Sequence, residues 1–269
     1  MVHLTIDIGN TATKAAIHAA REEDAGARGT ATLAATQPLQ HRRVEGHDLG
    51  WLRDFVGNDE VCACIVSSTI DVTAKMQRQI EQLAIPQVIR LDAATPIPIR
   101  NAYETPETLG PDRLAAAIGA YYETVNRVGE HRPVLVIDAG TAITYDLVTA
   151  DGKYLGGNIS PGIRLRFLAL HEHTAHLPLV NSQLSIHNSQ LSIGANTHSA
   201  ILHGVMDGVR HEIEGFISEF SGKYDSLFVF LTGGDTINFT DSIKNRIFAD
   251  EFLVSKGLDL ILQYNKLKV

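Results

Sequence analysis

Two short turns, each directly after an apolar strand, constrain this chain more than any other feature. The first is Asp7-Ile8-Gly9-Asn10-Thr11, and the second is Asp138-Ala139-Gly140-Thr141-Ala142-Ile143-Thr144. Each puts a carboxylate at the end of a strand, then a glycine with hydroxyl or amide side chains, and leads back into a second strand. Such turns aim backbone N–H groups at one point, where they can hold phosphate oxygens. A single copy is also typical of an ordinary hairpin, but the repetition favours a nucleoside triphosphate held from both sides.

The expected elements occur in the same order in both halves. In the first half, hydrophobic periodicity predicts strands at 2–8, 12–18, 42–45, 61–66 and 87–91. It also predicts a helix at 49–56 and a second one, carrying Met76, Ile80 and Leu83, that Ser67-Ser68-Thr69 caps. In the second half, strands are expected at 134–137, 142–148, 153–159 and 227–231, and helices at 112–126, 161–170, 201–217 and 257–268. The repeated order predicts a duplicated α/β architecture with a nucleotide in the cleft between two domains, 1–111 and 112–269.

Composition narrows the class of partner. The 269 residues are 44% hydrophobic and carry a formal charge of 23 − 31 = −8, which argues against nucleic acid or an anionic membrane as the main partner. Residues 21–38, rich in charged residues, Ala, Gly and Thr, are expected to form a solvated loop. No apolar run is long enough to span a membrane, and the N-terminus shows no signal h-region, so a cytoplasmic protein is expected.

Two groups of residues could suggest a metal site. Cys62 and Cys64 fit either a metal or redox pair or two small apolar residues in a buried strand, and the apolar context favours the strand. His171, His173 and His176 contain no pair at i, i+4 spacing, so a polar helix end or loop is favoured over a metal site.

Four further motifs occur in a defined order along the chain. They are Gly110-Pro111-Asp112-Arg113, Gly156-Gly157-Asn158-Ile159-Ser160-Pro161-Gly162, Gly194-Ala195-Asn196-Thr197 followed by Ala200-Ile201 and Gly204, and Thr232-Gly233-Gly234-Asp235. With the two turns, this set resembles the sugar kinase, heat-shock ATPase and actin superfamily, and within it the type III pantothenate kinases. The resemblance implies duplicated ribonuclease-H-like domains. It also implies ATP-dependent phosphorylation of pantothenate to 4′-phosphopantothenate, the first step of coenzyme A biosynthesis.

The resemblance also implies roles for the two turns. The ATP-binding residues would be Asp7, Ile8, Gly9, Asn10, Thr11, Ala12, Thr13, Lys14 and Thr141. Asp7 would organise Mg²⁺ through its hydration shell. Asp138 is similar to the residue that holds a monovalent cation, K⁺ or NH₄⁺. Lys14 either adds positive charge beside the phosphates or is a surface lysine. Thr232-Gly233-Gly234-Asp235 resembles the family's adenosine turn.

The substrate that accepts the phosphoryl group is expected to bind around Asp112. Taken alone, Asp112 beside Arg113 reads as an acidic residue that caps a helix; the resemblance makes it the general base. Arg113 suits a carboxylate or phosphate, because its guanidinium donates two parallel hydrogen bonds. Tyr103, Gly110, Pro111 and Thr197 complete the expected pantothenate site.

Three interpretations follow from these motifs. The leading one is a pantothenate kinase, whose family implies a homodimer; the apolar face of the helix at 197–217 is a candidate contact between subunits or simply covers the sheet. The second is another kinase of the superfamily, acting on acetate or a sugar. The third is a non-enzymatic nucleotide-sensing regulator.

Three segments depart from the family pattern. Pro111 stands where the family commonly has a small residue, and residues 20–38 look longer than the family needs. Asn-Ser-Gln-Leu-Ser-Ile occurs twice, at 181–186 and 188–193, and its polar composition predicts a surface loop.

Overall fold

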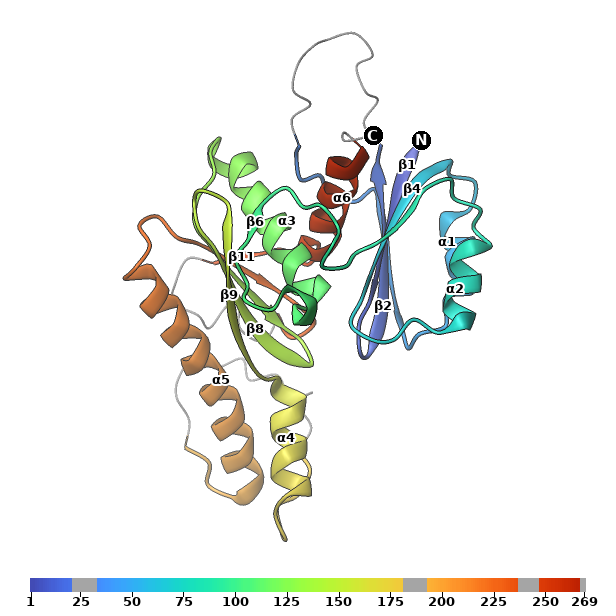
Figure 1. The fold of residues 1–269 in the computed structure, drawn as a ribbon. Helices are drawn as coiled ribbons and strands as arrows, with labels where there is room; N and C mark the ends of the chain where they lie inside the picture. The colour runs from blue at the N-terminus through green and yellow to red at the C-terminus, as the bar shows by residue number, and fades with distance from the viewer. Residues whose placement is uncertain (21–32, 181–192, 237–246, 267–269) are drawn as a thin grey trace. The chain divides into compact units, whose positions relative to one another are not determined.

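The computed structural model describes residues 1–20, 33–180, 193–236 and 247–266, which form two compact units (Figure 1). Unit 1 comprises Met1–His131, Asp151–Leu155 and Phe252–Val269, and unit 2 comprises Arg132–Ala150 and Gly156–Glu251. Most of the expected loop at 21–38, and the tandem repeat except for its last residue, lie outside the described residues.

The first sheet has the strand order β3-β2-β1-β4-β5. Its strands are β1 (Val2–Ile8), β2 (Ala12–Ala19), β3 (Gln40–Glu45), β4 (Val61–Ser68) and β5 (Val88–Arg90). The first three strands form an antiparallel meander, and β4 and β5 then run parallel to β1. The parallel strands are reached through the helices α1 (Leu52–Val56) and α2 (Ala74–Glu81).

The second sheet repeats this order. Its strands are β7 (Val134–Ala139), β8 (Ala142–Val148), β9 (Lys153–Pro161), β10 (Phe228–Thr232) and β11 (Phe248–Ala249). The sequence β9-β8-β7-β10-β11 matches β3-β2-β1-β4-β5 strand for strand, and the short β6 (Arg100–Asn101) adds to the edge beside β9. The duplicated α/β fold predicted from the sequence is therefore confirmed.

In unit 1, the two faces of β1 meet different helices. Leu4, Ile6 and Ile8 are fully buried in the core that includes α1 and α2, whereas His3 and Thr5 point to the opposite face. That face is covered by α6 (Leu253–Lys266), which packs along α3 (Pro111–Val128) (Figure 1). A Cβ on Gly119 of α3 or on Gly257 of α6 would collide with the backbone of the other helix, so these glycines permit the close packing. The 3₁₀ turn Pro106–Thr108 leads into α3.

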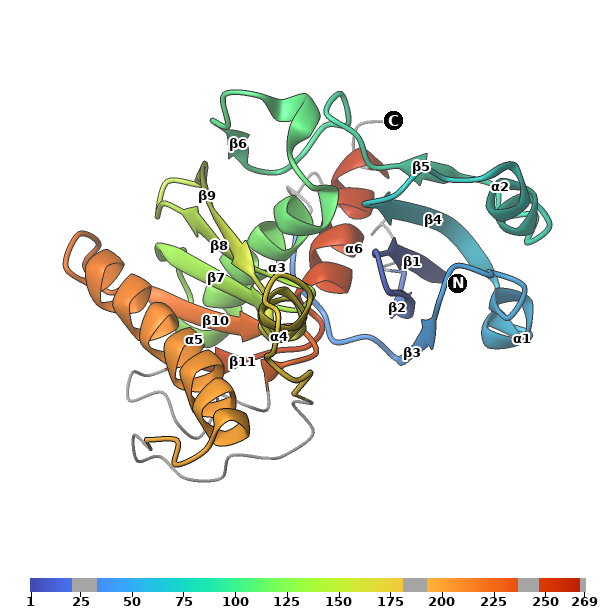
Figure 2. The same cartoon turned by 90° about the horizontal axis from the view of Figure 1, so that it is seen from below.

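Unit 2 is built around α5 (Thr197–Ser221), which lies along its sheet (Figure 2). The apolar residues of α5 are buried in one core with strand residues and with Ile163 and Phe167 of α4 (Ile163–Glu172). The apolar face of α5 therefore covers the sheet, which decides between the two roles that its sequence left open.

Several expected element ends are wrong; the helix expected at 49–56, for example, begins at Leu52. The cap of α2 is Thr73, which accepts a hydrogen bond from the Met76 N–H; Ser67 and Ser68 belong instead to β4. Pro161 ends β9 instead of opening α4, whose N-cap is Gly162. The helix expected from residue 257 begins at Leu253, four residues earlier.

The compact units do not follow the sequence-based division after residue 111. Both α3 and α6, which that division assigns to the C-terminal domain, pack with the first sheet. The units describe where contacts are dense, so the expected boundary between the duplicated domains stays a prediction.

A buried group of ionisable side chains lies between the first sheet and α6. The Nδ1 atom of His3 lies 2.7 Å from one carboxylate oxygen of Asp259, and the Nδ1 atom of His18 lies 3.9 Å from the other. Burial lowers the pKa of His18; Asp259 opposes this shift, while His3 and Lys256 add to it. His18 is therefore neutral in the folded protein near neutral pH.

We predict that unfolding becomes easier as the pH falls below about 6.5, the ordinary histidine value, because unfolded His18 then binds a proton that the folded residue does not. Replacing His18 with leucine should make the dependence of stability on pH shallower, by no more than one proton. Urea unfolding between about pH 7.5 and 5.5 measures this slope. The control, His173→Leu at the exposed end of α4, should leave the slope unchanged. Identical slopes for the wild type and His18→Leu would contradict the prediction.

Candidate active site

The first candidate phosphate turn joins β1 to β2 and has four residues. Ile8 and Thr13 are the last paired residues of the two strands, so residues 9–12 form the turn. The Gly9 N–H donates a hydrogen bond of 3.0 Å to the Ala12 carbonyl. The turn is therefore closed by its own backbone.

Side chains from neighbouring segments brace this turn. Ser67 of β4 donates its hydroxyl to the Asp7 carboxylate at 3.2 Å, and Nε2 of His47 donates to the Gly9 carbonyl at 3.0 Å. The tip of the turn, residues 10–11, is exposed to solvent. The structure thus fixes a carboxylate at the end of β1, beside an exposed turn of backbone.

Lys14 lies directly opposite Asp7 in the antiparallel pairing of β1 and β2. Cross-strand partners point to the same face of a sheet. The ammonium group and the carboxylate therefore share one face next to the turn, and Lys14 is only partly buried. This placement favours a charge beside the phosphates over an unrelated surface lysine, and the role stays a prediction.

The second candidate turn, between β7 and β8, is one residue shorter than the first. Ala139 and Ile143 are the last paired residues, which leaves residues 140–142 for the turn, and the Gly140 N–H donates to the Ala142 carbonyl at 3.0 Å. Its carboxylate, Asp138, lies at the end of β7 as Asp7 lies at the end of β1.

Two glycines from other segments pack onto the second turn. The Gly162 N–H donates to the Thr141 carbonyl at 3.1 Å, and a Cβ on Gly162 would collide with the carbonyl oxygens of Gly140 and Thr141. Gly233 has a positive φ of +99°, and a Cβ there would collide with the Asp138 carboxylate. Only glycine lets these two segments approach so closely.

The expected adenosine turn lies against the same place. The Asp235 N–H donates to the Ala139 carbonyl at 2.9 Å, so the segment Thr232-Gly233-Gly234-Asp235 is tied to the end of β7. Burial raises the pKa of Asp235 above its ordinary value. The structure therefore joins two motifs that lie nearly a hundred residues apart in the sequence.

Asp112 and Arg113 begin α3. Gly110 is the N-cap and Pro111 the first helical residue; a Cβ on Gly110 would come within 2.6 Å of the Asp112 carboxylate. The Asp112 carboxylate accepts the Arg113 N–H at 2.8 Å. Arg113 is buried as a residue, and its guanidinium carbon lies 5.9 Å from the centre of the Tyr103 ring. The structure thus brings three expected substrate residues into one cluster.

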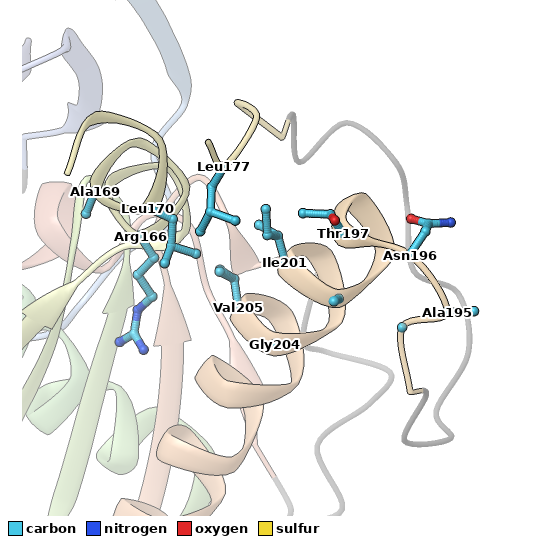
Figure 3. Close-up of a pocket in the computed structure, with 12 residues that line it drawn as sticks. Arg166, Ala169, Leu170, Leu177, Ala195, Asn196, Thr197, Ile201, Gly204 and Val205 are labelled. Atoms are coloured by element: carbon cyan, nitrogen blue, oxygen red, sulfur yellow. The ribbon is translucent and has the colours of Figure 1, made fainter. Parts of the chain in front are cut away.

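Thr197 is the first residue of α5 and is exposed. Asn196 caps the helix by accepting the Ser199 N–H at 2.9 Å. This end of α5 lines a pocket of about 870 Å³ between α4 and α5, where apolar side chains from both helices point toward one another (Figure 3). The lining residues are Arg166, Ala169, Leu170, Leu177, Gly194, Ala195, Asn196, Thr197, Ala200, Ile201, Gly204 and Val205.

The expected site residues divide between the two units. Residues 7–14, Tyr103 and residues 110–113 belong to unit 1. Asp138, Thr141 and Thr197 belong to unit 2.

The carboxylates suit a hydrated metal ion better than a closed protein cage. Among the residues described, no group of three or more His, Cys, Asp or Glu side chains could hold a metal ion. Mg²⁺ in kinases keeps several waters and uses one or two carboxylates together with substrate phosphates. A single strand-end carboxylate beside a phosphate turn, as at Asp7, fits that requirement.

Comparison with known proteins assigns the family. A family model described as type III pantothenate kinase matches residues 3–219. The chain belongs to this family. A type III pantothenate kinase from Bacteroides fragilis is 40% identical over 264 residues, which covers 98% of each chain. Membership in a kinase family implies the use of ATP with a divalent metal and a small-molecule acceptor.

Solved structures with little sequence identity share the fold. A Campylobacter jejuni protein described as a Baf family transcriptional activator has a TM-score of 0.56 at 19% identity, over 98% of this chain and 99% of its own. A Listeria monocytogenes protein described as an N-acetylmannosamine kinase has a TM-score of 0.53 at 12% identity, over 98% and 100%. At such identities, these likenesses concern the fold alone.

One polar cluster in unit 2 was not predicted from the motifs of the pantothenate kinase family. Glu212 of α5 accepts hydrogen bonds from Tyr145 at 2.8 Å, from Ser160 at 2.5 Å and from Arg166 at 2.6 Å. Partial burial would raise the pKa of Glu212, but these hydrogen bonds outweigh it and hold the pKa below its ordinary value. Ser160 lies in a family motif, yet nothing local in the sequence marks Glu212 as its partner.

His171 and Cys64 belong to the two groups of residues that could suggest a metal site. Nδ1 of His171 donates to the Leu177 carbonyl at 2.9 Å. Cys64 is fully buried in β4, and burial raises the pKa of its thiol to about 12. Among the described helices, none combines the length and the apolar character needed to cross a membrane.

Proposed function

We propose that this protein transfers the γ-phosphoryl group of ATP to pantothenate, the first step of coenzyme A biosynthesis. The family match over residues 3–219 carries the proposal, together with 40% identity to a pantothenate kinase along nearly the whole chain. The clustering of Tyr103, Asp112 and Arg113 supports it, because these are the residues that the family resemblance assigns to the acceptor.

In this proposal the two turns hold the nucleotide. Residues 9–14 of unit 1 and Thr141 of unit 2 both bind phosphate oxygens. Asp7 holds hydrated Mg²⁺, which when bound neutralises charge on the β- and γ-phosphates. The Thr232-Gly233-Gly234-Asp235 segment lies beside adenosine.

Asp112 is proposed as the general base. It accepts the proton of the pantothenate hydroxyl as the phosphoryl group is transferred, and much of its value lies in orienting that hydroxyl. Arg113 donates to the pantothenate carboxylate, while Tyr103, Gly110 and Pro111 shape the site around the substrate. Thr197 contacts the pantothenate chain.

Replacing Asp112 with asparagine should keep the shape of the site and remove its proton acceptor. We expect kcat to fall about 10²- to 10⁴-fold with pantothenate as acceptor. Asp54→Asn, which changes an exposed carboxylate in the first turn of α1, should leave kcat unchanged. Near wild-type turnover by Asp112→Asn would refute the assignment of the base. A wild-type enzyme that phosphorylates acetate or a sugar but not pantothenate would refute the proposed function.

We also propose that Asp138 holds a monovalent cation. A carboxylate next to a polyphosphate is repulsive unless a cation lies between them. The Gly233 backbone packs closely against the Asp138 carboxylate, which fixes the position of this negative charge at the end of β7.

Activity should therefore depend on a monovalent cation as well as on Mg²⁺. Steady-state rates with Mg-ATP are measured in sodium, potassium and ammonium buffers of equal ionic strength. We expect turnover with K⁺ or NH₄⁺ and little with Na⁺ alone. Equal rates in all three buffers would exclude a required K⁺ or NH₄⁺ ion.

The proposed working form is a homodimer. The buried apolar face of α5 is not available for this contact, because it already covers the sheet of unit 2. Instead, Ile159 of β9, Leu165 of α4 and Leu179 are exposed apolar residues of the same unit. These side chains are the better candidates for a surface that meets a second copy.

Replacing Leu165 with glutamate should weaken the dimer and lower activity at low protein concentration, because a charge would be buried at the contact. Light scattering should give twice the chain mass for the wild type and a smaller mass for the variant. The control is Val128→Glu, an exposed apolar position on α3 in unit 1. A fully active wild-type monomer at assay concentration would contradict the homodimer.

A further inference from the structure

The polar cluster around Glu212 joins four separate elements of unit 2. Tyr145 comes from β8, Ser160 from β9, Arg166 from α4 and Glu212 from α5. The Glu212 and Arg166 side chains are only 24% and 22% exposed. Such a partly buried ion pair is screened less by solvent than a surface pair.

Arg166 extends this cluster to the end of β9. Its Nε donates to the Pro161 carbonyl at 2.7 Å, and its terminal nitrogen donates both to Ser160 at 3.3 Å and to Glu212 at 2.6 Å. One guanidinium therefore holds backbone and side-chain oxygens of consecutive residues. This use depends on the planar fork of arginine.

The residue after Pro161 is the glycine that contacts the second phosphate turn. The Gly162 N–H donates to the Thr141 carbonyl, and the Gly162 backbone lies so close to residues 140–141 that no side chain fits between them. Any shift of Pro161 and Gly162 would therefore move the backbone of the turn. A continuous chain of contacts leads from Glu212 through Arg166, Pro161 and Gly162 to Thr141.

We propose that Glu212 and Arg166 are positioning residues for the nucleotide phosphates. Together they hold residues 160–162 against the turn at 140–141, so that the turn is set in its phosphate-binding shape before ATP arrives. The inference rests on the proposed role of that turn in ATP binding. Neither side chain needs to touch the nucleotide.

The attachment of α5 to the sheet does not depend on this cluster. The helix already buries the seven apolar residues Ile201, Leu202, Val205, Met206, Val209, Ile213 and Ile217. Loss of the Glu212 charge should therefore disturb the segment at 160–162 more than the fold of the unit. A substitution at Glu212 that weakens ATP binding but leaves the unit folded would therefore distinguish a positioning role from a purely structural one.

The test uses Glu212→Gln in the full chain. Binding of a non-hydrolysable ATP analogue with Mg²⁺ is measured by calorimetry without pantothenate, followed by kcat, both KM values and the melting temperature. We expect about tenfold weaker analogue binding and a similar rise in KM for ATP, because small displacements of positioning groups can cost up to about 10²-fold. KM for pantothenate should rise less than KM for ATP, because Glu212 does not line the pocket at the start of α5 and contacts it only through Arg166.

Two further variants sharpen the result. Arg166→Lys keeps the charge but cannot serve Pro161 and Glu212 with one planar group, so it should weaken analogue binding by less than Glu212→Gln does. If Glu212→Gln does not fold, Arg166→Lys is used in its place, and unchanged analogue affinity in Arg166→Lys would then overturn the inference. Glu219→Gln, which breaks an exposed ion pair with Lys223 near the end of the same helix, should bind the analogue as the wild type does.

Unchanged analogue affinity in folded Glu212→Gln, or an equal loss in Glu219→Gln, would overturn the inference. A lower melting temperature with unchanged analogue affinity would also overturn it, because that pattern belongs to a structural role. A failure of the proposed function can be told apart from a failure of this inference. If the wild type binds the analogue but does not phosphorylate pantothenate, the acceptor is wrong, and the comparison of analogue affinities still decides the role of Glu212.

Discussion

The close backbone packing around the second phosphate turn is the constraint on which the candidate site of unit 2 depends. Residues 138–141, 160–162 and 232–235 meet there although they are far apart in the sequence, and backbone hydrogen bonds to Thr141 and Ala139 tie them together. Gly162 and Gly233 are required because a Cβ at either position would collide with the turn. The shape of this turn therefore depends on glycine positions in other segments as well as on its own residues.

Backbone from other segments contacts both turns of the duplicated fold. Both follow the first strand of the same strand order, β3-β2-β1-β4-β5 and β9-β8-β7-β10-β11. In the longer first turn the Thr11 carbonyl accepts the Gly46 N–H at 2.9 Å, and side chains add contacts from Ser67 to Asp7 and from His47 to Gly9. The shorter second turn is packed directly against other backbone.

Much of the fold could be predicted from the sequence because strands and turns leave local signals. Alternating apolar residues marked β1, and a continuous apolar run marked β7. The ends of helices and strands were harder to predict, because several residues that could equally well cap a helix stand close together in the sequence. Ser67 and Ser68 look like caps but extend β4, and the cap is Thr73. The link between Glu212 and Ser160 spans 52 residues and depends on the folded path of the chain, so no local pattern could reveal it.

The length of α5 keeps Thr197, at its start, away from Glu212. Glu212, which reaches the second phosphate turn through Ser160 and Arg166, lies fifteen residues after Thr197. At about 1.5 Å per residue, the two positions are about 22 Å apart along the helix. Arg166 of α4 nevertheless lines the same pocket as Thr197 and also binds Glu212 at 2.6 Å. Arg166 is therefore the residue that connects the pocket at the start of α5 with the segment at 160–162, to which it donates through the Pro161 carbonyl.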